Sequence, residues 1–163
     1  TKGKVMVAFR KLLLLLLSIV LAANSALAAE ERQNWRLRAA GFTEPADDGS
    51  GLDLDSFNGI STHLGRFSGQ GAHMLFEDFT FTGYATYTAA NGDQLDVVYD
   101  GAVTAFDVFP FPVEGDFVVV GGTGRFANAT GCAEMKGSFT GVPGEMFFEL
   151  RGTLHPQGGR VGR

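Results

Sequence analysis

Glycines separate short runs in which apolar and polar residues alternate, and this pattern most strongly limits how the chain can fold. The sequence contains 23 glycines and 15 phenylalanines among 163 residues, whereas an average protein contains about 7% glycine. No Gly-X-Y period accompanies the glycines, which excludes a collagen-like helix. Short alternating runs bounded by turn residues are typical of β-structure, so we expect an all-β domain.

The first 28 residues have a different composition from the rest. Lys4, Arg10 and Lys11 precede an apolar run at 12–23, and Ala26-Leu27-Ala28 then supplies the small residues that a signal peptidase reads. This order predicts a secretory signal peptide over residues 1–28. A membrane anchor is the alternative, but the run is shorter than the roughly 20 residues that span a bilayer. We therefore expect a secreted or periplasmic protein, with a β-domain at 29–154 and a flexible C-terminal tail at 155–163.

Charge is distributed unevenly about the expected cleavage site. All 18 acidic residues follow it and four of the 13 basic residues precede it, which leaves nine basic residues and a net charge of −9. Phosphate backbones would repel such a domain, so we expect no nucleic-acid partner. No basic amphipathic stretch is present after residue 28, so we also expect no membrane binding after cleavage.

Alternating apolar residues predict seven or eight strands and no long helix. The predicted strands cover residues 35–39, 60–67, 72–76, 79–88, 95–103, 117–120, 133–139 and 146–154, and residues 45–51 form a loop. The second and third runs can also be one long strand that bends at Gly69 and Gly71. This number of strands indicates either a β-sandwich or a closed barrel.

The Asn91-Gly92 pair lies between two alternating runs and predicts a type I′ hairpin turn. In the run that follows, one parity is apolar and the other is mostly polar. We expect the apolar parity to be buried (Leu95, Val97, Tyr99, Val103) and Gln94, Asp96 and Asp100 to be exposed. Val98 breaks the polar parity, which indicates either a subunit contact or ordinary apolar surface.

A glycine-rich segment at 122–127 fits the dinucleotide-binding pattern G-x-G-x-x-A after an apolar run. That chemistry requires a helix whose N-terminal amides hold the pyrophosphate. Here the chain continues as Asn128-Ala129-Thr130-Gly131 and then alternates again. We therefore interpret Gly121, Gly122 and Gly124 as turn residues, and we expect no cofactor.

The same segment carries a family resemblance. The stretch 121–126 (Gly-Gly-Thr-Gly-Arg-Phe) with Ala129-Thr130-Gly131 resembles the G-G-T-G-x-F…A-x-G segment of the allene oxide cyclase and dirigent barrels. Segments 62–67 and 90–93 are similar to those of uncharacterised bacterial secreted proteins of this type. The resemblance covers residues 59–154 and implies an eight-stranded antiparallel barrel with an apolar lumen, often dimeric or trimeric in the plant relatives. It carries over no catalytic residue.

The histidine, aspartate and cysteine residues give only weak evidence for a functional site. The three histidines, at positions 63, 73 and 155, do not have the spacing of a compact zinc site, and we expect no metal. Asp47, Asp48, Asp53 and Asp55 lack the D-x-D-x-D-G order of a calcium loop, and we place Asp96 and Asp100 on a solvated face. Cys132 is the one cysteine, and we interpret it as a small apolar residue that faces the barrel interior.

Two main functions remain open. One is a secreted, non-catalytic barrel that binds a small apolar or aromatic ligand, or a partner. The other is a cyclase or isomerase that acts on an apolar substrate in the lumen, where a buried ionisable group should face the cavity. A structural surface protein, with a solidly packed lumen, is a third interpretation. The expected ligand-binding residues are His63, Phe79, Phe81, Tyr87, Tyr99 and Phe117.

Overall fold

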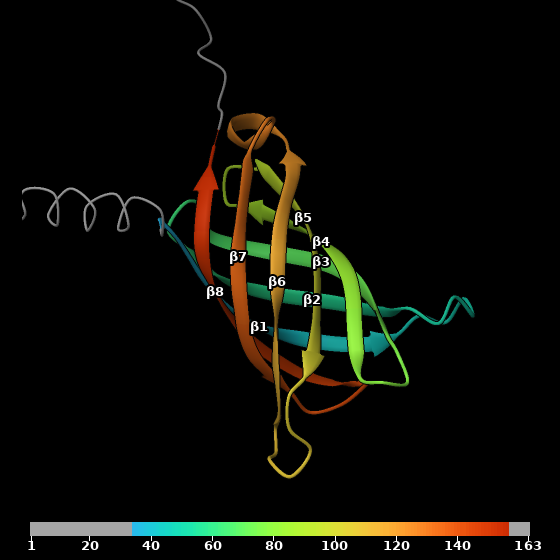
Figure 1. Ribbon diagram of the computed structural model, residues 1–163. Coiled ribbons are helices and arrows are strands. Elements are labelled where there is room, and N and C mark those ends of the chain that lie inside the picture. The colour runs from blue at the N-terminus through green and yellow to red at the C-terminus, as the bar shows by residue number, and fades with distance from the viewer. Residues whose placement is uncertain (1–33, 157–163) are drawn as a thin grey trace, which may run out of the picture. The chain divides into compact units, whose positions relative to one another are not determined.

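The computed structural model describes residues 34–156, which form one closed antiparallel barrel of eight strands (Figure 1). The strands are β1 (Trp35–Pro45), β2 (Asp53–Ser61), β3 (Gly65–Leu75), β4 (Thr80–Ala89), β5 (Gln94–Val103), β6 (Phe111–Gly122), β7 (Thr130–Phe139) and β8 (Gly144–His155). A 3-10 turn, η1 (Gly124–Phe126), connects β6 to β7. Within this part of the chain, no helix is long and apolar enough to cross a bilayer.

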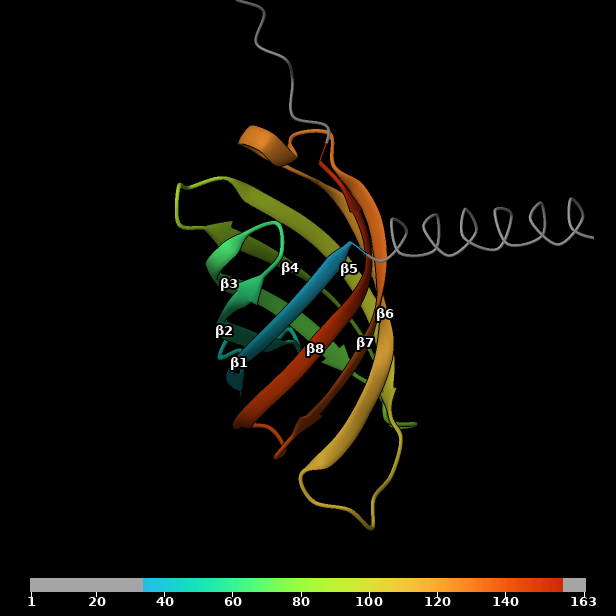
Figure 2. The same cartoon turned by 90° about the vertical axis from the view of Figure 1, so that its left-hand side faces the viewer.

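Each strand pairs with its neighbour in sequence, and β8 returns to pair with β1, as Figure 2 shows. In this closing pair Ala39 lies opposite Phe148 and Leu37 lies opposite Leu150, all with buried side chains. Because each of the eight described strands has two partners, their sheet has no free edge. The expected antiparallel barrel is therefore confirmed, and the β-sandwich alternative is wrong.

The strand assignment was wrong in one region. The structure has a strand at Asp53–Ser61 that the sequence did not predict, and the run at 60–67 contains the turn Thr62–Leu64 rather than one strand. In β2, the inward parity is Asp53, Asp55 and Phe57, while Leu54 is 44% exposed. Because two of the inward residues are aspartates, β2 lacks the alternation of apolar inward and polar outward residues by which a strand is recognised.

One end of the barrel is closed by large side chains. Trp35, Phe126 and Leu154 are 0% exposed, and Leu64 of the β2–β3 turn is 3% exposed. Two hydrogen bonds join the residue before β1 to β8 here: the Asn34 side chain donates to the Leu154 carbonyl oxygen at 3.1 Å and accepts from the Leu154 amide at 2.9 Å. We call this end, which carries η1 at the top of Figure 1, the closed end.

The two faces of β5 follow the predicted parity with differences in degree. Leu95, Val97 and Val103 are buried, and Tyr99 is mostly buried. Asp100 is exposed, but Gln94 and Asp96 are only half exposed, and Thr86 donates a hydrogen bond of 2.7 Å to the Asp96 carboxylate. On the outer face, Val98 lies between Tyr84 and Val118 in one cross-strand row, and all three side chains are more than 40% exposed.

The β4–β5 hairpin has a different turn from the one predicted. The Gly92 amide donates to the Ala89 carbonyl oxygen, and the Ala89 amide donates to the Asp93 carbonyl oxygen, both at 2.9 Å. Ala90 and Asn91 are therefore the central residues, and only Gly92 has a positive φ, of 87°. This is a three-residue turn with a glycine bulge and not the type I′ turn.

The glycine-rich segment forms the connection between β6 and β7. Gly124 has a φ of 56°, and a Cβ at this position would collide with the Asp93 carboxylate. Only the three residues of η1 are helical before β7 begins, so the segment has no helix terminus that could hold a pyrophosphate. The segment instead packs Phe126 into the closed end.

The expectation for Cys132 was wrong. Its side chain is exposed on the outer face of β7, because Ala133 and Met135 take the inward parity and are buried. A small apolar residue type did not by itself decide which parity faces the core.

Candidate functional site

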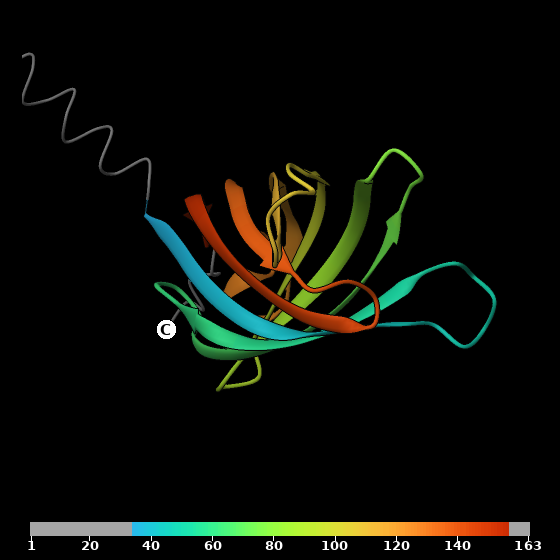
Figure 3. The same ribbon diagram turned by 90° about the horizontal axis from the view of Figure 1, so that it is seen from below.

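The other end of the barrel contains a cavity, and we call it the open end. It is bounded by the connections at 46–52, 76–79, 104–110 and 140–143, and Figure 3 shows the molecule from the side of the last two. The cavity has a volume of about 90 Å³ and opens to solvent between these loops. Its lining residues are Thr43, Asp55, Phe57, His73, Leu75, Phe81, Ala85, Tyr87, Tyr99, Val113, Phe117, Met135, Ser138, Phe139, Met146, Phe147 and Phe148.

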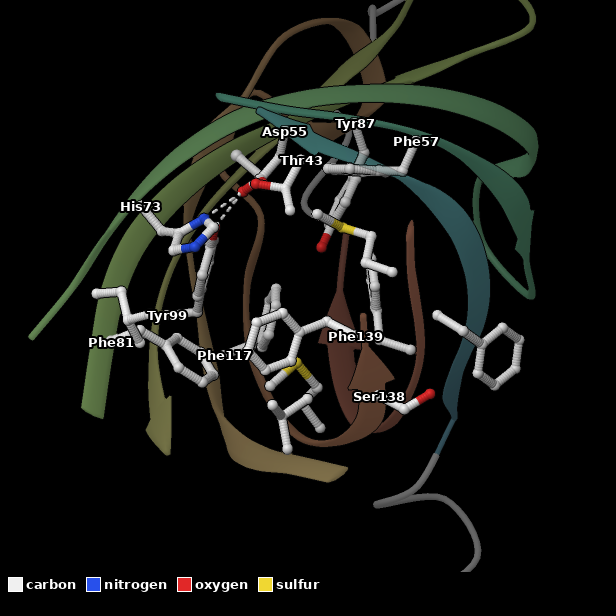
Figure 4. A pocket seen from close by; sticks show the side chains of 17 residues that line it. Thr43, Asp55, Phe57, His73, Phe81, Tyr87, Tyr99, Phe117, Ser138 and Phe139 are labelled. Atoms are coloured by element: carbon white, nitrogen blue, oxygen red, sulfur yellow. Dashed lines mark hydrogen bonds and ion pairs between the residues drawn. The ribbon is translucent and has the colours of Figure 1, made fainter. Parts of the chain in front are cut away.

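A hydrogen-bonded group of three side chains lies on one wall of the cavity (Figure 4). Asp55 Oδ2 accepts a hydrogen bond of 2.9 Å from the Tyr99 hydroxyl and lies 3.0 Å from His73 Nδ1. The other ring nitrogen of His73, Nε2, lies 3.6 Å from Asp53 Oδ2. The Asp55 side chain is only 4% exposed, so this is a buried carboxylate that contacts an imidazole and a phenol.

The strand register creates this group. Asp53 of β2 lies directly opposite His73 of β3, and Asp55 is two residues further along the same face of β2. On the other side of β4, Tyr99 of β5 lies opposite Gly83, which itself lies opposite His73. A Cβ at Gly83 would collide with the Tyr99 ring, so this glycine leaves the room through which Tyr99 reaches Asp55.

The surroundings of the network change the pKa values of four side chains. Burial alone lowers the pKa of His73, but the hydrogen bond to Asp55 and the charges of Asp55 and Asp53 outweigh burial, so the pKa is raised above 6.5. Burial and the charge of Asp55 raise the pKa of Asp53 against the opposing effect of His73. Burial and the Asp55 charge also raise the pKa values of Tyr87 and Tyr99. Both tyrosines are therefore neutral hydrogen-bond donors near neutral pH.

Three buried oxygens at the cavity have no hydrogen-bond partner among the described residues. They are Thr43 Oγ1, Asp55 Oδ1 and Tyr87 Oη. The three residues are 1%, 6% and 0% exposed, respectively, and all three line the cavity, into which the Tyr87 hydroxyl points (Figure 4). Thr43 and Asp55 lie directly opposite each other in the β1–β2 register. Buried polar atoms normally have partners, so this group of oxygens makes the cavity the candidate binding site.

Aromatic rings form much of the remaining wall. Eight of the 17 lining residues are phenylalanine or tyrosine. The Tyr99 and Phe117 rings are stacked with centroids 4.7 Å apart, and the Phe117 and Phe148 rings are stacked at 6.2 Å. On the other side, Phe57 makes an edge contact with Tyr87 at 5.3 Å. An apolar, aromatic cavity with a few polar groups is typical of small-molecule sites.

The structure brings four of the six expected ligand-binding residues together at this cavity: Phe81, Tyr87, Tyr99 and Phe117. Phe79 lies in the β3–β4 connection, is 47% exposed and contacts Phe106 at 4.6 Å, so it does not line the cavity. His63 lies in the β2–β3 turn at the closed end. There, burial lowers its pKa, but it does not face the cavity.

Sequence reasoning missed Asp55, His73 and Thr43. Asp55 was considered only as a calcium ligand in a loop, and His73 only as a zinc ligand. The available signal was the i, i+2 spacing of Asp53, Asp55 and Phe57, which places two carboxylates on the same strand face as a core aromatic residue. Across residues 34–156, no group of three or more His, Cys, Asp or Glu side chains is arranged to hold a metal ion.

Comparison with known proteins supports the fold class. No family model matches this chain, and no curated protein sequence matches it. A solved structure of a pterocarpan synthase dirigent protein does match, with 14% sequence identity and a TM-score of 0.50 over 81% of this chain and 90% of that chain. The domain therefore has a dirigent-like β-barrel fold. At this identity the likeness establishes the fold alone.

Proposed function

We propose that the domain binds one small, mostly apolar or aromatic molecule in the open-end cavity and releases it unchanged. The aromatic wall supplies apolar contact area, and the buried oxygens supply orientation. Cavities for drug-sized ligands measure roughly 300–1,000 Å³, whereas this one measures about 90 Å³. The ligand, or the part of it that enters the barrel, is therefore no larger than about one aromatic ring.

The three buried oxygens without partners carry this proposal. Leaving one buried polar group unsatisfied costs about 1–3 kcal/mol, and the cavity contains Thr43 Oγ1, Asp55 Oδ1 and Tyr87 Oη together. A ligand with a polar group at one end would supply the missing partners and recover part of this cost. A chain that needed only a stable barrel would gain by replacing the Thr43 and Tyr87 hydroxyls with apolar groups.

A cyclase or isomerase is the second candidate, and one observation favours it. The Asp55 carboxylate is buried, held by His73 and Tyr99, and has one free oxygen at the cavity. Such a group could move a proton to or from a bound substrate. The third interpretation, a purely structural barrel, is disfavoured by the cavity, since a structural barrel needs no free volume in its lumen.

Mass spectrometry of small molecules that copurify with the protein tests the proposal. We expect one predominant ligand with a single ring, which is lost from the variant Met146→Trp because the larger side chain narrows the cavity beside Phe139. As a matched control, Met74→Trp lies outside the cavity lining and should keep the ligand. Identical ligand content in both variants would contradict the proposal. Conversion of the purified ligand by wild-type protein, but not by Asp55→Asn, would instead support the cyclase or isomerase.

Export and self-association complete the proposal. The signal peptide expected at 1–28 lies outside the described residues, and N-terminal sequencing of secreted protein should begin at Ala29.

The exposed row of Tyr84, Val98 and Val118 offers an apolar surface on the outer face of three neighbouring strands. We expect Val98→Glu to shift an oligomer to monomer in sedimentation analysis.

A further inference from the structure

We propose that the open-end cavity selects a cation, and that its ligand class is a small aromatic or apolar primary amine. This inference rests on the proposed function, because it specifies the charge of the molecule that binds at the same site. Three features carry it: the charge of the mouth, the three free oxygens, and the aromatic wall around a buried carboxylate.

The four loops around the mouth carry only negative charge. Their titratable residues are Asp47, Asp48, Glu77, Asp78 and Asp107, and none of the four connections contains a lysine or arginine. The arginines near the chain reversals lie at the closed end instead, at Arg36, Arg66 and Arg125. A cleft lined by charges of one sign raises the local concentration of ligands of the opposite charge. The mouth therefore favours cations and repels anions.

The inside of the cavity also favours a cation. Asp53 and Asp55 together carry two negative charges when ionised, and a protonated His73 compensates one of them. The tyrosines add no charge, so the network of Asp53, Asp55 and His73, of which Asp55 and His73 line the cavity, is left with an excess of one negative charge. A buried carboxylate gains most from a partner that is itself charged, and a bound ammonium group beside Asp55 Oδ1 would neutralise this excess.

The free polar atoms match an ammonium group in number and kind. Thr43 Oγ1, Asp55 Oδ1 and Tyr87 Oη are all oxygens that can accept a hydrogen bond, and a primary ammonium has three donors and no acceptor. A hydroxyl group could also contact these oxygens, but it would gain nothing from the negative charge of the mouth and wall. A carboxylate would face Asp55 directly and be repelled.

The aromatic wall stabilises a cation further. The rings of Phe57, Tyr87 and Tyr99 all line the cavity, and the Tyr99 hydroxyl bonds to Asp55 (Figure 4). The face of an aromatic ring attracts a cation by about 0.5–2 kcal/mol, most strongly where water is excluded. The same rings provide apolar contact for the body of the ligand, so the aromatic lining serves both parts of an aromatic amine.

His73 couples binding to pH. It faces Asp53 and Asp55 on β2, and Tyr99 on β5 shares the Asp55 oxygen with it, while β4 presents only Phe81 and Gly83 beside it. An ammonium group at Asp55 would repel the proton on His73 and lower the pKa of that imidazole. Amine binding should therefore release part of a proton and strengthen as pH rises through the titration of His73.

Calorimetry with three probes of one shape tests the inference: benzylamine, benzyl alcohol and benzoate, titrated into the purified protein at about pH 7. We expect benzylamine to bind about tenfold tighter than benzyl alcohol, equal to about 1.4 kcal/mol, and benzoate to bind weakest. Alcohol binding as tight as amine binding would overturn the cation preference and leave the proposed function standing. Failure of all three probes to bind would contradict both.

Two variants separate the role of Asp55 from a general effect of charge. Asp55→Asn should reduce the preference for benzylamine over benzyl alcohol to about twofold or less, because the charged partner is lost. Asp96→Asn removes a carboxylate from the outer face, where Thr86 donates a hydrogen bond to it, and should leave the preference unchanged. An unchanged preference in Asp55→Asn would overturn the proposal.

Wild-type protein supplies a further test that does not depend on a variant that folds. Benzylamine titrated in buffers of different ionisation enthalpy should show release of part of a proton, and benzyl alcohol should show none. Added salt should slow association of the amine and not of the alcohol, because it screens the carboxylates of the mouth. No proton release and no difference in salt dependence would contradict the inference.

Discussion

At the closed end of the barrel, Trp35, Phe126 and Leu154 pack without accessible surface, whereas at the open end a cavity of about 90 Å³ contains three buried oxygens without partners among the described residues. The closed end is tied by hydrogen bonds between Asn34 and Leu154 and carries arginines, while the open end carries carboxylates in its loops. Under the proposed function, the same eight strands serve stability at one end and binding at the other. Stabilising contacts and unsatisfied polar groups are separated along the barrel axis.

Truncating a side chain at the closed end should have the largest effect on stability. We expect Trp35→Ala to lower the free energy of unfolding by about 3–5 kcal/mol, since it empties a fully buried site. The matched change at the open end, Phe81→Ala, should cost about 1–2 kcal/mol, because Phe81 is only partly buried. Urea denaturation of both variants measures the difference, and equal losses would refute the division between the two ends.

Removing the buried carboxylate should have the next largest effect. Asp55→Ala leaves His73 and Tyr99 without their shared acceptor, and we expect a loss of about 2 kcal/mol in unfolding free energy. Asp96→Ala is the control, because it loses a single bond from Thr86 at a half-exposed site. If both variants lost the same stability, the open-end network would have no special energetic role.

Stability should depend on pH through His73. Its pKa is raised in the folded state above the ordinary value of 6.5, so the protonated form is stabilised by folding. This contribution is complete below about pH 6.5 and is lost as pH rises through the folded-state pKa. Unfolding curves from mildly acidic to mildly alkaline pH should show this decline, and His73→Gln should flatten it. Because the lowered pKa of His63 contributes in the opposite direction, the comparison is with His73→Gln, and the same pH dependence in both proteins would contradict the assigned network.

The smallest expected effect concerns a turn at the closed end. Gly92 has a φ of 87°, and a β-branched residue resists this conformation. Gly92→Val should cost about 1 kcal/mol or more in unfolding free energy and leave ligand affinity unchanged, because the turn is remote from the cavity. Thermal unfolding and a binding titration on the same sample measure both quantities, and an unchanged melting temperature would contradict the turn.

The fold was largely predictable from the sequence, and the polar part of the site was not. Strands such as β5 and β8 alternate apolar and polar residues, and the segment at 121–131 carries a recognisable barrel resemblance. The predicted aromatic residues Phe81, Tyr87, Tyr99 and Phe117 line the cavity because apolar residues on strands tend to face the lumen. These signals are local in the sequence, so they can be recognised without coordinates.

The site's polar group depends on contacts between distant residues. Asp55 bonds to Tyr99 across 44 positions in the chain and to His73 across 18, and only the strand register brings the three together. The inward aspartates also made β2 look like a loop. His63 and Phe79 were predicted to bind a ligand and do not line the cavity. A residue type suited to binding does not indicate which end or face of the barrel the residue occupies.

Binding of a ring-sized ligand at the open end can be tested most directly by NMR of the methionine methyl groups. Met135 and Met146 line the cavity, while Met74 of β3 lies outside its lining. Titration with benzylamine or benzyl alcohol should shift the methyl resonances of Met135 and Met146 in a saturable manner and leave Met74 unchanged. Saturable shifts confined to Met74, or no change at any of the three methyl groups, would contradict binding at this cavity.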